Sequence, residues 1–178
     1  MNAGRIFAVI IVASALIVGA SVYYLQVYAF YDEVGPSGPQ DVTLVPVGSD
    51  TPEPVPHSGF RAIDADSSPI RYRACFAVDV DDEALAAFTP YPKADPLNAP
   101  GWFDCFDADE IGEALATGEA RAYLSVPDVH YGIDRVIAVL PDGRGFAWHQ
   151  INHCGEVVFD GQPAPEGCAA PPEGTARQ

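Results

Sequence analysis

The chain has 178 residues, of which 48% are hydrophobic and 19% are charged, and its formal net charge is −16. This length and composition fit one folded domain with appendages and exclude a disordered chain. The acidic balance excludes nucleic-acid binding and a polybasic membrane-surface protein, because both need clustered Lys and Arg side chains.

The N-terminal segment predicts a membrane span. No charged residue occurs among the 26 residues from Ile6 to Tyr31. A helix of that length is about 39 Å long, enough to cross a hydrocarbon core of about 30 Å with some tilt. Arg5 lies just before the span, so the positive-inside rule places residues 1–5 in the cytoplasm. We therefore expect a single-pass inner-membrane protein anchored by residues 6–31, with a periplasmic body.

A cleaved signal peptide is the alternative interpretation. Val18, Gly19 and Ala20 supply the small residues that a signal peptidase needs after an apolar core. The segment from Ser21 to Tyr31 stays apolar, however, which a mature soluble N-terminus rarely needs. Both interpretations export the rest of the chain, and the retained anchor is favoured.

Proline content divides the exported part into three regions. Residues 32–56 are rich in Pro, Gly and acidic residues, which predicts an extended linker. Residues 57–168 form the expected folded domain, long enough for a modest core. Residues 169–178 are expected to be a disordered tail.

The first part of the domain predicts a hairpin and two short helices. Segments 60–65 and 70–78 flank a turn and are expected to pair as strands. Segment 81–88 predicts a short helix with acidic residues in its first turn. Segment 107–118 predicts a second helix, capped by an aspartate at its start and ended by a glycine.

The clearest pattern is a second hairpin near the C-terminus. Segment 134–140 is β-branched and apolar, and segment 145–151 follows a Pro-Asp-Gly-Arg turn. A two-residue loop at 142–143 pairs Val139 with Phe146, which places aromatic against β-branched residues.

Two further segments, 120–126 and 156–160, are expected to add strands to the sheet. Helices mixed with hairpins, without a regular βαβ alternation, indicate an α+β domain with an antiparallel sheet and two short helices.

Four cysteines agree with export to an oxidising compartment. Cys75, Cys105, Cys154 and Cys168 form an even set, which in a small exported domain predicts two disulfides. Three pairings are open, and we favour 75–105 with 154–168 because each closes a moderate loop, worth about 2–4 kcal/mol. Their spacing does not match a structural zinc site, and we expect no metal and no cofactor.

The richest cluster of titratable residues is His130, Asp134, His149, His153 and Glu156. Two of these histidines are four residues apart, but they fall on a strand and a turn, where that spacing does not bring them together. We interpret the cluster as structural and assign no catalytic or metal-binding residue. The chain also has no nucleophile elbow, P-loop or EF-hand motif.

Five segments carry a resemblance to a known family: YYLQVY (23–28), APGWFDC (99–105), HYGIDR (130–135), WHQIN (148–152) and GQP (161–163). Together they resemble a family of small alphaproteobacterial single-span membrane proteins of unknown function. The resemblance implies a bacterial inner-membrane setting and carries no catalytic residue over to this chain.

Three hypotheses follow for function. After Tyr31 the chain has 8 basic and 25 acidic residues, so the leading hypothesis is a non-enzymatic accessory protein that binds a cationic protein or a basic face of a membrane complex. A second is a metal-dependent or hydrolytic enzyme, which requires the five titratable residues above to converge in one pocket. A third is a ligand-sensing ectodomain.

Overall fold

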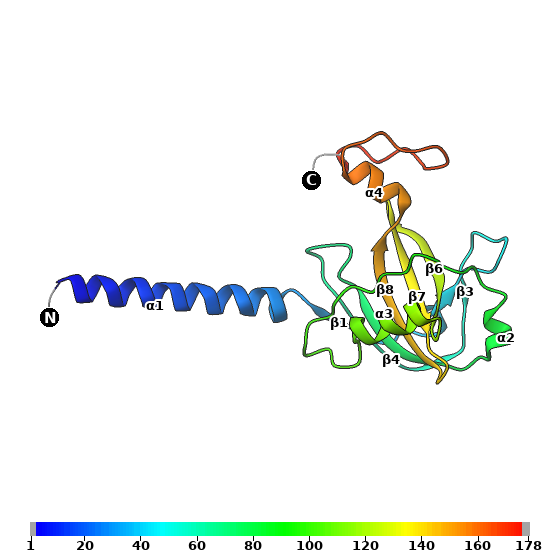
Figure 1. The fold of residues 1–178 in the computed structure, drawn as a ribbon, viewed down its shortest axis with the longest axis horizontal. Helices are drawn as coiled ribbons and strands as arrows, with labels where there is room; N and C mark the ends of the chain where they lie inside the picture. Colours follow the sequence, from blue (N-terminus) through cyan, green and yellow to red (C-terminus); the bar gives the residue numbers. More distant parts are fainter. Residues whose placement is uncertain (1–2, 176–178) are drawn as a thin grey trace.

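An apolar helix and an antiparallel sheet domain make up the structure, a computed structural model that describes residues 3–175. Helix α1 (Ala3–Tyr24) continues as a π-helical turn, η1 (Leu25–Ala29), and projects alone from the domain (Figure 1). By length and composition these 27 residues can cross a bilayer. The mixed α+β fold class is therefore confirmed, with the apolar helix where the sequence predicts it.

Six strands form the main sheet, and all neighbouring strands in it are antiparallel. In spatial order they are β1 (Asp32–Val34), β4 (His57–Asp64), β5 (Arg73–Val78), β8 (Arg144–Ile151), β7 (Ile133–Val139) and β6 (Arg121–His130). The two expected hairpins are β4–β5 and β7–β8, so both are confirmed.

The register of the β7–β8 hairpin differs from the expected one by one residue. Val139 pairs with Gly145, and Phe146 pairs with Ala138. The loop has three residues rather than two, and its last residue, Gly143, has φ 84°. A three-residue hairpin loop with its last residue in the left-handed region is a common alternative to the two-residue turn. The expected pairing of Val139 with Phe146 is therefore wrong.

Both faces of the sheet are buried. The first core contains Tyr72, Phe76, Leu85, Tyr123 and Ile137 among its members. The second core, on the opposite face, is built around these side chains: Phe103, Phe106, Ile111, Phe146 and Trp148. Consecutive residues of a strand point to opposite faces, so each central strand contributes to both cores.

The segment expected to be a linker is part of the domain. Within 32–56, β1 pairs with β4, and β2 (Thr43–Leu44) pairs with β3 (Glu53–Pro54). Val42, Leu44 and Val55 are buried in the first core. The segment folds over the sheet instead of extending away from the domain, because burying these three apolar side chains is favourable. The expected boundary at residue 57 is therefore wrong.

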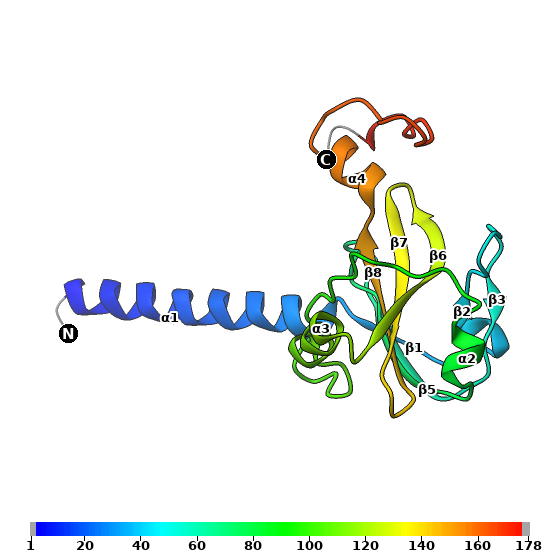
Figure 2. The ribbon, with the colours of Figure 1, turned by 45° about the vertical axis from the view of Figure 1, so that its right-hand side comes forward.

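Short helices cover the sheet on its two sides. Helix α3 (Ala108–Thr117) buries Ile111 and Ala114 against the second core. The Asp107 carboxylate accepts hydrogen bonds from two N–H groups of its first turn, and Gly118 ends it in the left-handed conformation, as expected. Helix α2 (Asp82–Leu85) is shorter than expected. Figures 1 and 2 place α2, β2 and β3 on the side of the sheet away from α1.

The expected strand at 156–160 is wrong, because this segment belongs to helix α4 (His153–Phe159). Asn152 accepts a hydrogen bond from Gly155 N through its side chain and so caps the helix. Local capping outweighs the β propensity of the two valines that suggested a strand. The structure describes the expected tail as far as Thr175, and residues 176–178 lie outside the described residues.

Two disulfides join the favoured cysteine pairs. Cys75 of β5 is bonded to Cys105, which attaches the loop before α3 to the sheet. Cys154 of α4 is bonded to Cys168, which attaches the C-terminal segment to this helix. The two bonds join residues that are 30 and 14 positions apart in the chain.

The contact between α4 and the β6–β7 turn gives a test of this fold. A Cβ at Gly155 would overlap the Gly132 carbonyl oxygen and the Ile151 side chain, so Gly155→Ala should lower the free energy of unfolding by about 1–3 kcal/mol. Gly112→Ala in α3 is the matched control, because its Cβ would have only Pro96 Cγ nearby, at 3.7 Å. The control should be neutral or stabilising by about 0.5–1 kcal/mol. Denaturant unfolding, followed by circular dichroism, compares the free energies of unfolding of the two variants. An equal change in both variants would contradict the close approach of Gly155 to Gly132.

Candidate functional site

The five titratable residues singled out from the sequence do not converge. Asp134 lies on the same face of the sheet as Val136 in the second core. His149 lies on the other face, the face of Ala147 in the first core. The sheet itself therefore separates the two most buried members, Asp134 and His149, and the convergence required by the enzyme hypothesis is wrong.

Asp134 is the centre of a hydrogen-bond network that attaches α4 to the sheet. It is 8% exposed and accepts hydrogen bonds from Tyr91 Oη at 3.2 Å, Asp128 N at 3.0 Å and Asn152 Nδ2 at 2.9 Å. Asn152 is also the cap of α4. Burial, followed by the nearby Asp134 charge, raises the pKa of Tyr91, so its phenol stays a hydrogen-bond donor. This network is a structural support for the turn that precedes β7.

His149 is held as a neutral ring between two fixed partners. Arg135 Nε donates to its Nε2 at 3.1 Å, so its Nδ1 carries the proton and donates to the Pro69 carbonyl at 2.7 Å. The Tyr72 ring stacks on it at 4.7 Å between centroids. Burial, together with the Arg135 charge, lowers its pKa from 6.5 to about 4. His149 therefore attaches the turn at Pro69 to the sheet and has no free nitrogen for a metal or a substrate.

The remaining three members, His130, His153 and Glu156, are exposed. His130 is exposed and lines a cavity of about 830 Å³ together with His149. His153 and Glu156 are exposed on α4. Within residues 3–175, no group of three or more His, Cys, Asp or Glu side chains is arranged to hold a metal ion. The geometry therefore gives no support for metal-dependent chemistry at this cluster.

Arg73 is a key buried residue that sequence reasoning missed. It is 4% exposed, and its guanidinium donates to four carbonyls: Leu97 at 2.6 Å, Ile70 at 2.8 Å, Tyr72 at 2.6 Å and Asn98 at 3.1 Å. Burial lowers its pKa to about 10, so it stays charged at neutral pH. The signal in the sequence is a charged residue at the head of an apolar strand, 73–78.

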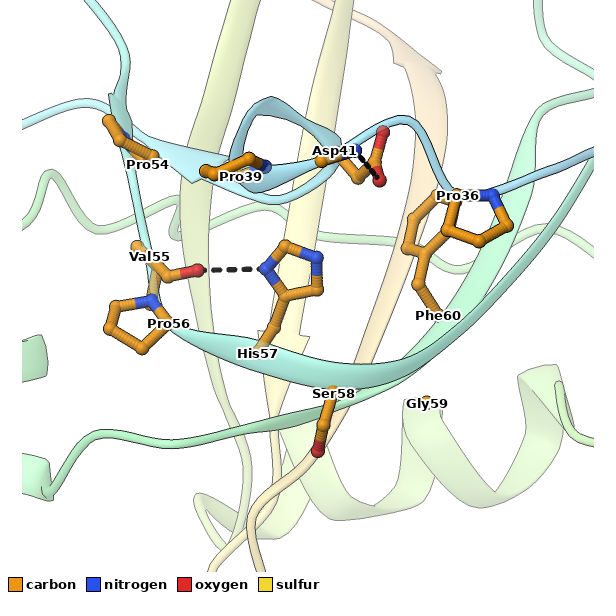
Figure 3. A pocket seen from close by; sticks show the side chains of 11 residues that line it. Pro36, Pro39, Asp41, Pro54, Val55, Pro56, His57, Ser58, Gly59 and Phe60 are labelled. Atoms are coloured by element: carbon orange, nitrogen blue, oxygen red, sulfur yellow. Dashed lines mark hydrogen bonds between the residues drawn. The ribbon is translucent and has the colours of Figure 1, made fainter.

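A pocket of about 740 Å³ lies between β4 and the segment that precedes β2 (Figure 3). Four prolines and one phenylalanine contribute to its walls: Pro36, Pro39, Pro54, Pro56 and Phe60. The pocket opens where the β1–β4 ladder ends, because pairing stops at Val34 and Ala62. Its proline and aromatic lining makes this pocket a candidate binding site.

Two polar groups of this pocket have fixed roles. His57 Nδ1 donates to the Val55 carbonyl at 2.9 Å, which leaves Nε2 as an acceptor (Figure 3). Burial alone would raise the pKa of Asp41, but hydrogen bonds from the Ser37 hydroxyl and from the N–H groups of Gly38 and Ser37 outweigh burial and lower it. An apolar wall with one acceptor and one anion suits a cationic group on an apolar stem.

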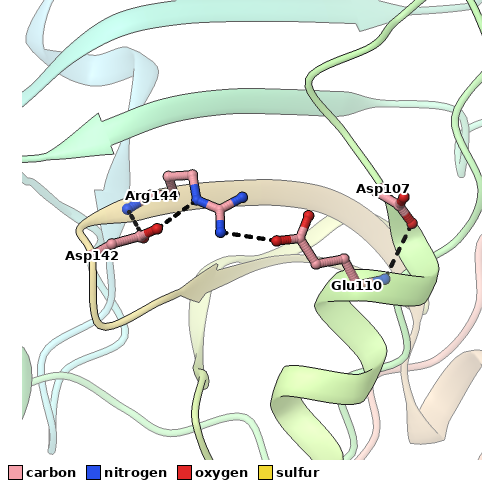
Figure 4. Close-up of polar contacts among 4 residues, drawn as sticks. All are labelled: Asp107, Glu110, Asp142 and Arg144. Atoms are coloured by element: carbon pink, nitrogen blue, oxygen red, sulfur yellow. Dashed lines mark hydrogen bonds and ion pairs between the residues drawn. The ribbon is translucent and has the colours of Figure 1, made fainter.

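Two arginines on the surface, Arg144 and Arg61, are paired inside the domain. Arg144 joins the β7–β8 turn to α3 through Asp142 Oδ2 at 2.7 Å and Glu110 Oε1 at 2.9 Å (Figure 4). Arg61 pairs with Asp104 at 3.2 Å. These side chains are half exposed, so each pair contributes only about 0–1 kcal/mol to stability. Because these arginine charges are already paired, they do not neutralise the other carboxylates on the surface.

The neutral state of His149 predicts a dependence of stability on pH. The pKa of His149 is about 4 in the folded chain, against 6.5 for an ordinary histidine side chain, so the unfolded chain binds the proton more readily between these two pH values. The stabilisation is complete above about pH 6.5 and falls by up to about 3 kcal/mol as the pH drops through 4.

Chemical unfolding of wild type and His149→Phe between pH 7 and pH 4 measures this effect. The variant should be less stable at pH 7 and should lose most of the slope, because the phenyl ring keeps the stack on Tyr72 but cannot titrate. His153→Gln, at an exposed position of α4, is the control and should keep the wild-type slope. If the free energy of unfolding changed equally with pH in wild type and His149→Phe, the assignment of this pH dependence to His149 would be contradicted.

Comparison with known proteins places this domain in a family. No curated protein and no solved structure matches the chain. A family model described as a family of unknown function (DUF6446) matches residues 42–169, which is more than half of the chain and includes all four cysteines. The match confirms the resemblance to a family of unknown function, and it begins inside the segment that folds over the first core. The chain therefore belongs to the DUF6446 family of unknown function.

Proposed function

We propose that this chain is a membrane-anchored, non-enzymatic interaction protein whose acidic domain binds a cationic protein partner. The proposal depends on which charged residues of the domain already have partners inside the protein. Of the 8 basic residues after Tyr31, five are engaged inside the protein: Arg61, Arg71, Arg73, Arg135 and Arg144. Within residues 3–175, ion pairs engage only three of the 25 acidic residues: Asp104, Glu110 and Asp142. The surface therefore attracts cations, which favours encounter with a basic partner.

The proline-lined pocket supplies a contact point for that partner. It includes Pro54 of β3, which lies on the side of the sheet away from α1 (Figure 2), so a partner can approach it without meeting the membrane. A Lys or Arg side chain can place its stem along Phe60 and the prolines, and its charge near Asp41. Exposed carboxylates at Glu53 and Asp79 flank this side.

The anchor is proposed to be retained and to enter the membrane with its N-terminus in the cytoplasm, so that the domain lies in the periplasm. The helical span runs without a break from Ala3 to Ala29, across the candidate cleavage point at Ala20, and its length suits a bilayer, which supports retention. Cleavage after Ala20 would leave an apolar helical stub attached to the domain. Two disulfides agree with an oxidising compartment.

Reporter fusions test the orientation. A phosphatase that folds only outside the cytoplasm, fused after Gln178, should be active, and a fluorescent protein that matures only in the cytoplasm should be dark in the same place. The intact mass of the protein purified from the membrane fraction should correspond to the uncleaved chain. A bright cytoplasmic reporter would contradict the orientation, and a mass that lacks residues 1–20 would contradict the anchor.

Binding experiments test the partner class. The full chain in detergent is used to capture proteins from native membranes, and the purified partner is then titrated at low and high salt. Affinity should fall by about tenfold or more between about 50 and 500 mM salt, because the attraction is between exposed charges. Unchanged affinity over that range would rule out the electrostatic mechanism.

Matched charge variants locate the binding side. Glu53→Gln with Asp79→Asn removes two carboxylates beside the pocket and should lower affinity by about three- to tenfold. Glu113→Gln with Glu119→Gln removes the same charge on the α3 side of the sheet, where both residues are exposed, and should have a smaller effect. A larger loss in the α3 variant would move the partner away from the pocket.

A further inference from the structure

The end of the apolar helix is attached directly to the domain. Only Phe30 and Tyr31 separate η1 from β1. Tyr28 stacks on Trp102 with ring centroids 6.4 Å apart, and Tyr31 meets the same indole edge-on at 6.1 Å. No flexible stalk therefore lies between the membrane helix and the sheet, in contrast to the expected linker.

Trp102 also satisfies a backbone group at the end of the helix. The last four carbonyls of a helix have no partner within the helix, and an unpaired carbonyl is costly near lipid. Trp102 Nε1 donates to one of them, the Val27 carbonyl, at 2.6 Å. The indole thus combines a hydrogen bond and aromatic stacking at one point of the helix.

The length of the helix places this contact at the level of the lipid headgroups. With Arg5 at the cytoplasmic boundary, the helix from Ile6 to Ala29 is about 36 Å long, whereas the hydrocarbon core is about 30 Å thick. About one turn therefore extends beyond the hydrocarbon. This turn carries Tyr28, whose ring contacts those of Tyr23 and Tyr24 one turn earlier, and Trp and Tyr side chains favour this interfacial layer.

The neighbouring loops are held firmly enough to keep one orientation. Arg73 binds the Leu97 and Asn98 carbonyls and the Ile70 carbonyl, so it joins the 97–104 loop to the 66–71 turn. His149 holds the same turn through Pro69. Both loops are thus fixed to the sheet beside the end of the helix.

Arg71 adds a cationic group at this junction. Its guanidinium lies 5.5 Å from the centroid of the Tyr31 ring, and its Nη2 is 3.4 Å from Gln26 Oε1. Its Nη1 is buried and has no hydrogen-bond acceptor within residues 3–175, so this nitrogen is closed to a lipid phosphate. Arg71 therefore contributes its positive charge to this surface rather than a free donor.

We propose that the surface formed by the 66–71 turn and the 97–104 loop rests on the lipid headgroup layer, with Trp102 as its interfacial anchor. Trp102 completes the aromatic belt begun by the tyrosines of the helix. The domain is then fixed against the bilayer with the proline-lined pocket on the opposite side. This inference depends on the retained anchor proposed above.

Tryptophan fluorescence tests the proposal, because the chain has only 2 tryptophans. The full chain is reconstituted in phosphatidylcholine nanodiscs in which part of the lipid carries a spin label on its headgroup. Trp148 is 0% exposed in the second core and should not be quenched. The spin label should therefore quench about half of the wild-type emission, and little of the emission of Trp102→Phe.

Two further variants keep the test decisive. Trp148→Phe leaves Trp102 as the single reporter, and most of its emission should be quenched even if the core variant loses some stability. Trp102→Phe combined with Phe88→Trp moves the reporter to a half-buried position just after α2, on the side away from α1, and should show no quenching. Folding of each variant is checked by circular dichroism.

The outcomes separate this proposal from the proposed anchoring. If the intact mass shows residues 1–20 retained and the wild-type emission is unquenched, the domain stands away from the bilayer and this proposal is wrong, while the anchor stands. Equal quenching at positions 102 and 88 would also overturn it, because the domain would then have no fixed orientation. A chain processed after Ala20 would overturn both proposals.

Discussion

The pairing register of β7 with β8 is the constraint on which the rest of the domain depends. These two strands are central and both of their faces are buried, with Val136 and Trp148 in one core and Ile137 and Ala147 in the other. Because side chains alternate along a strand, a slip by one residue would exchange the contents of the two cores. The three-residue loop that ends at Gly143 sets the observed register, and Arg144 ties that loop to α3.

The same register explains why the titratable residues form no catalytic site. It places Asp134 on one face and His149 on the other, each with its hydrogen-bonding capacity used by neighbouring backbone and side chains. Both residues support structure: Asp134 positions α4, and His149 positions the turn at Pro69. Buried polar groups of this kind need complete hydrogen bonding, and here that requirement also fixes the loops at the surface.

The domain consequently has two different sides. On the side of α1, Trp102, Arg71 and Arg73 connect the helix, the 66–71 turn and the 97–104 loop. On the other side, the segment before β4 covers the first core and forms the proline-lined pocket with Asp41 at its edge. In the proposed arrangement, an anchor joined to the sheet by two residues transmits its orientation to the domain, and the pocket faces away from the bilayer.

The sequence by itself determined the features that depend on local chemistry: the apolar span, the Asp107 cap, the two hairpins, the favoured cysteine pairs and the surplus of acidic residues. It located the five titratable residues but not their separation, and it missed Trp102, Arg73 and the pocket at His57. Only the tertiary structure decided the strand register, the folding of residues 32–56 over the first core and the docking of the helix on Trp102. These features depend on contacts between residues far apart in the chain, which hydrophobic periodicity and turn propensity do not encode.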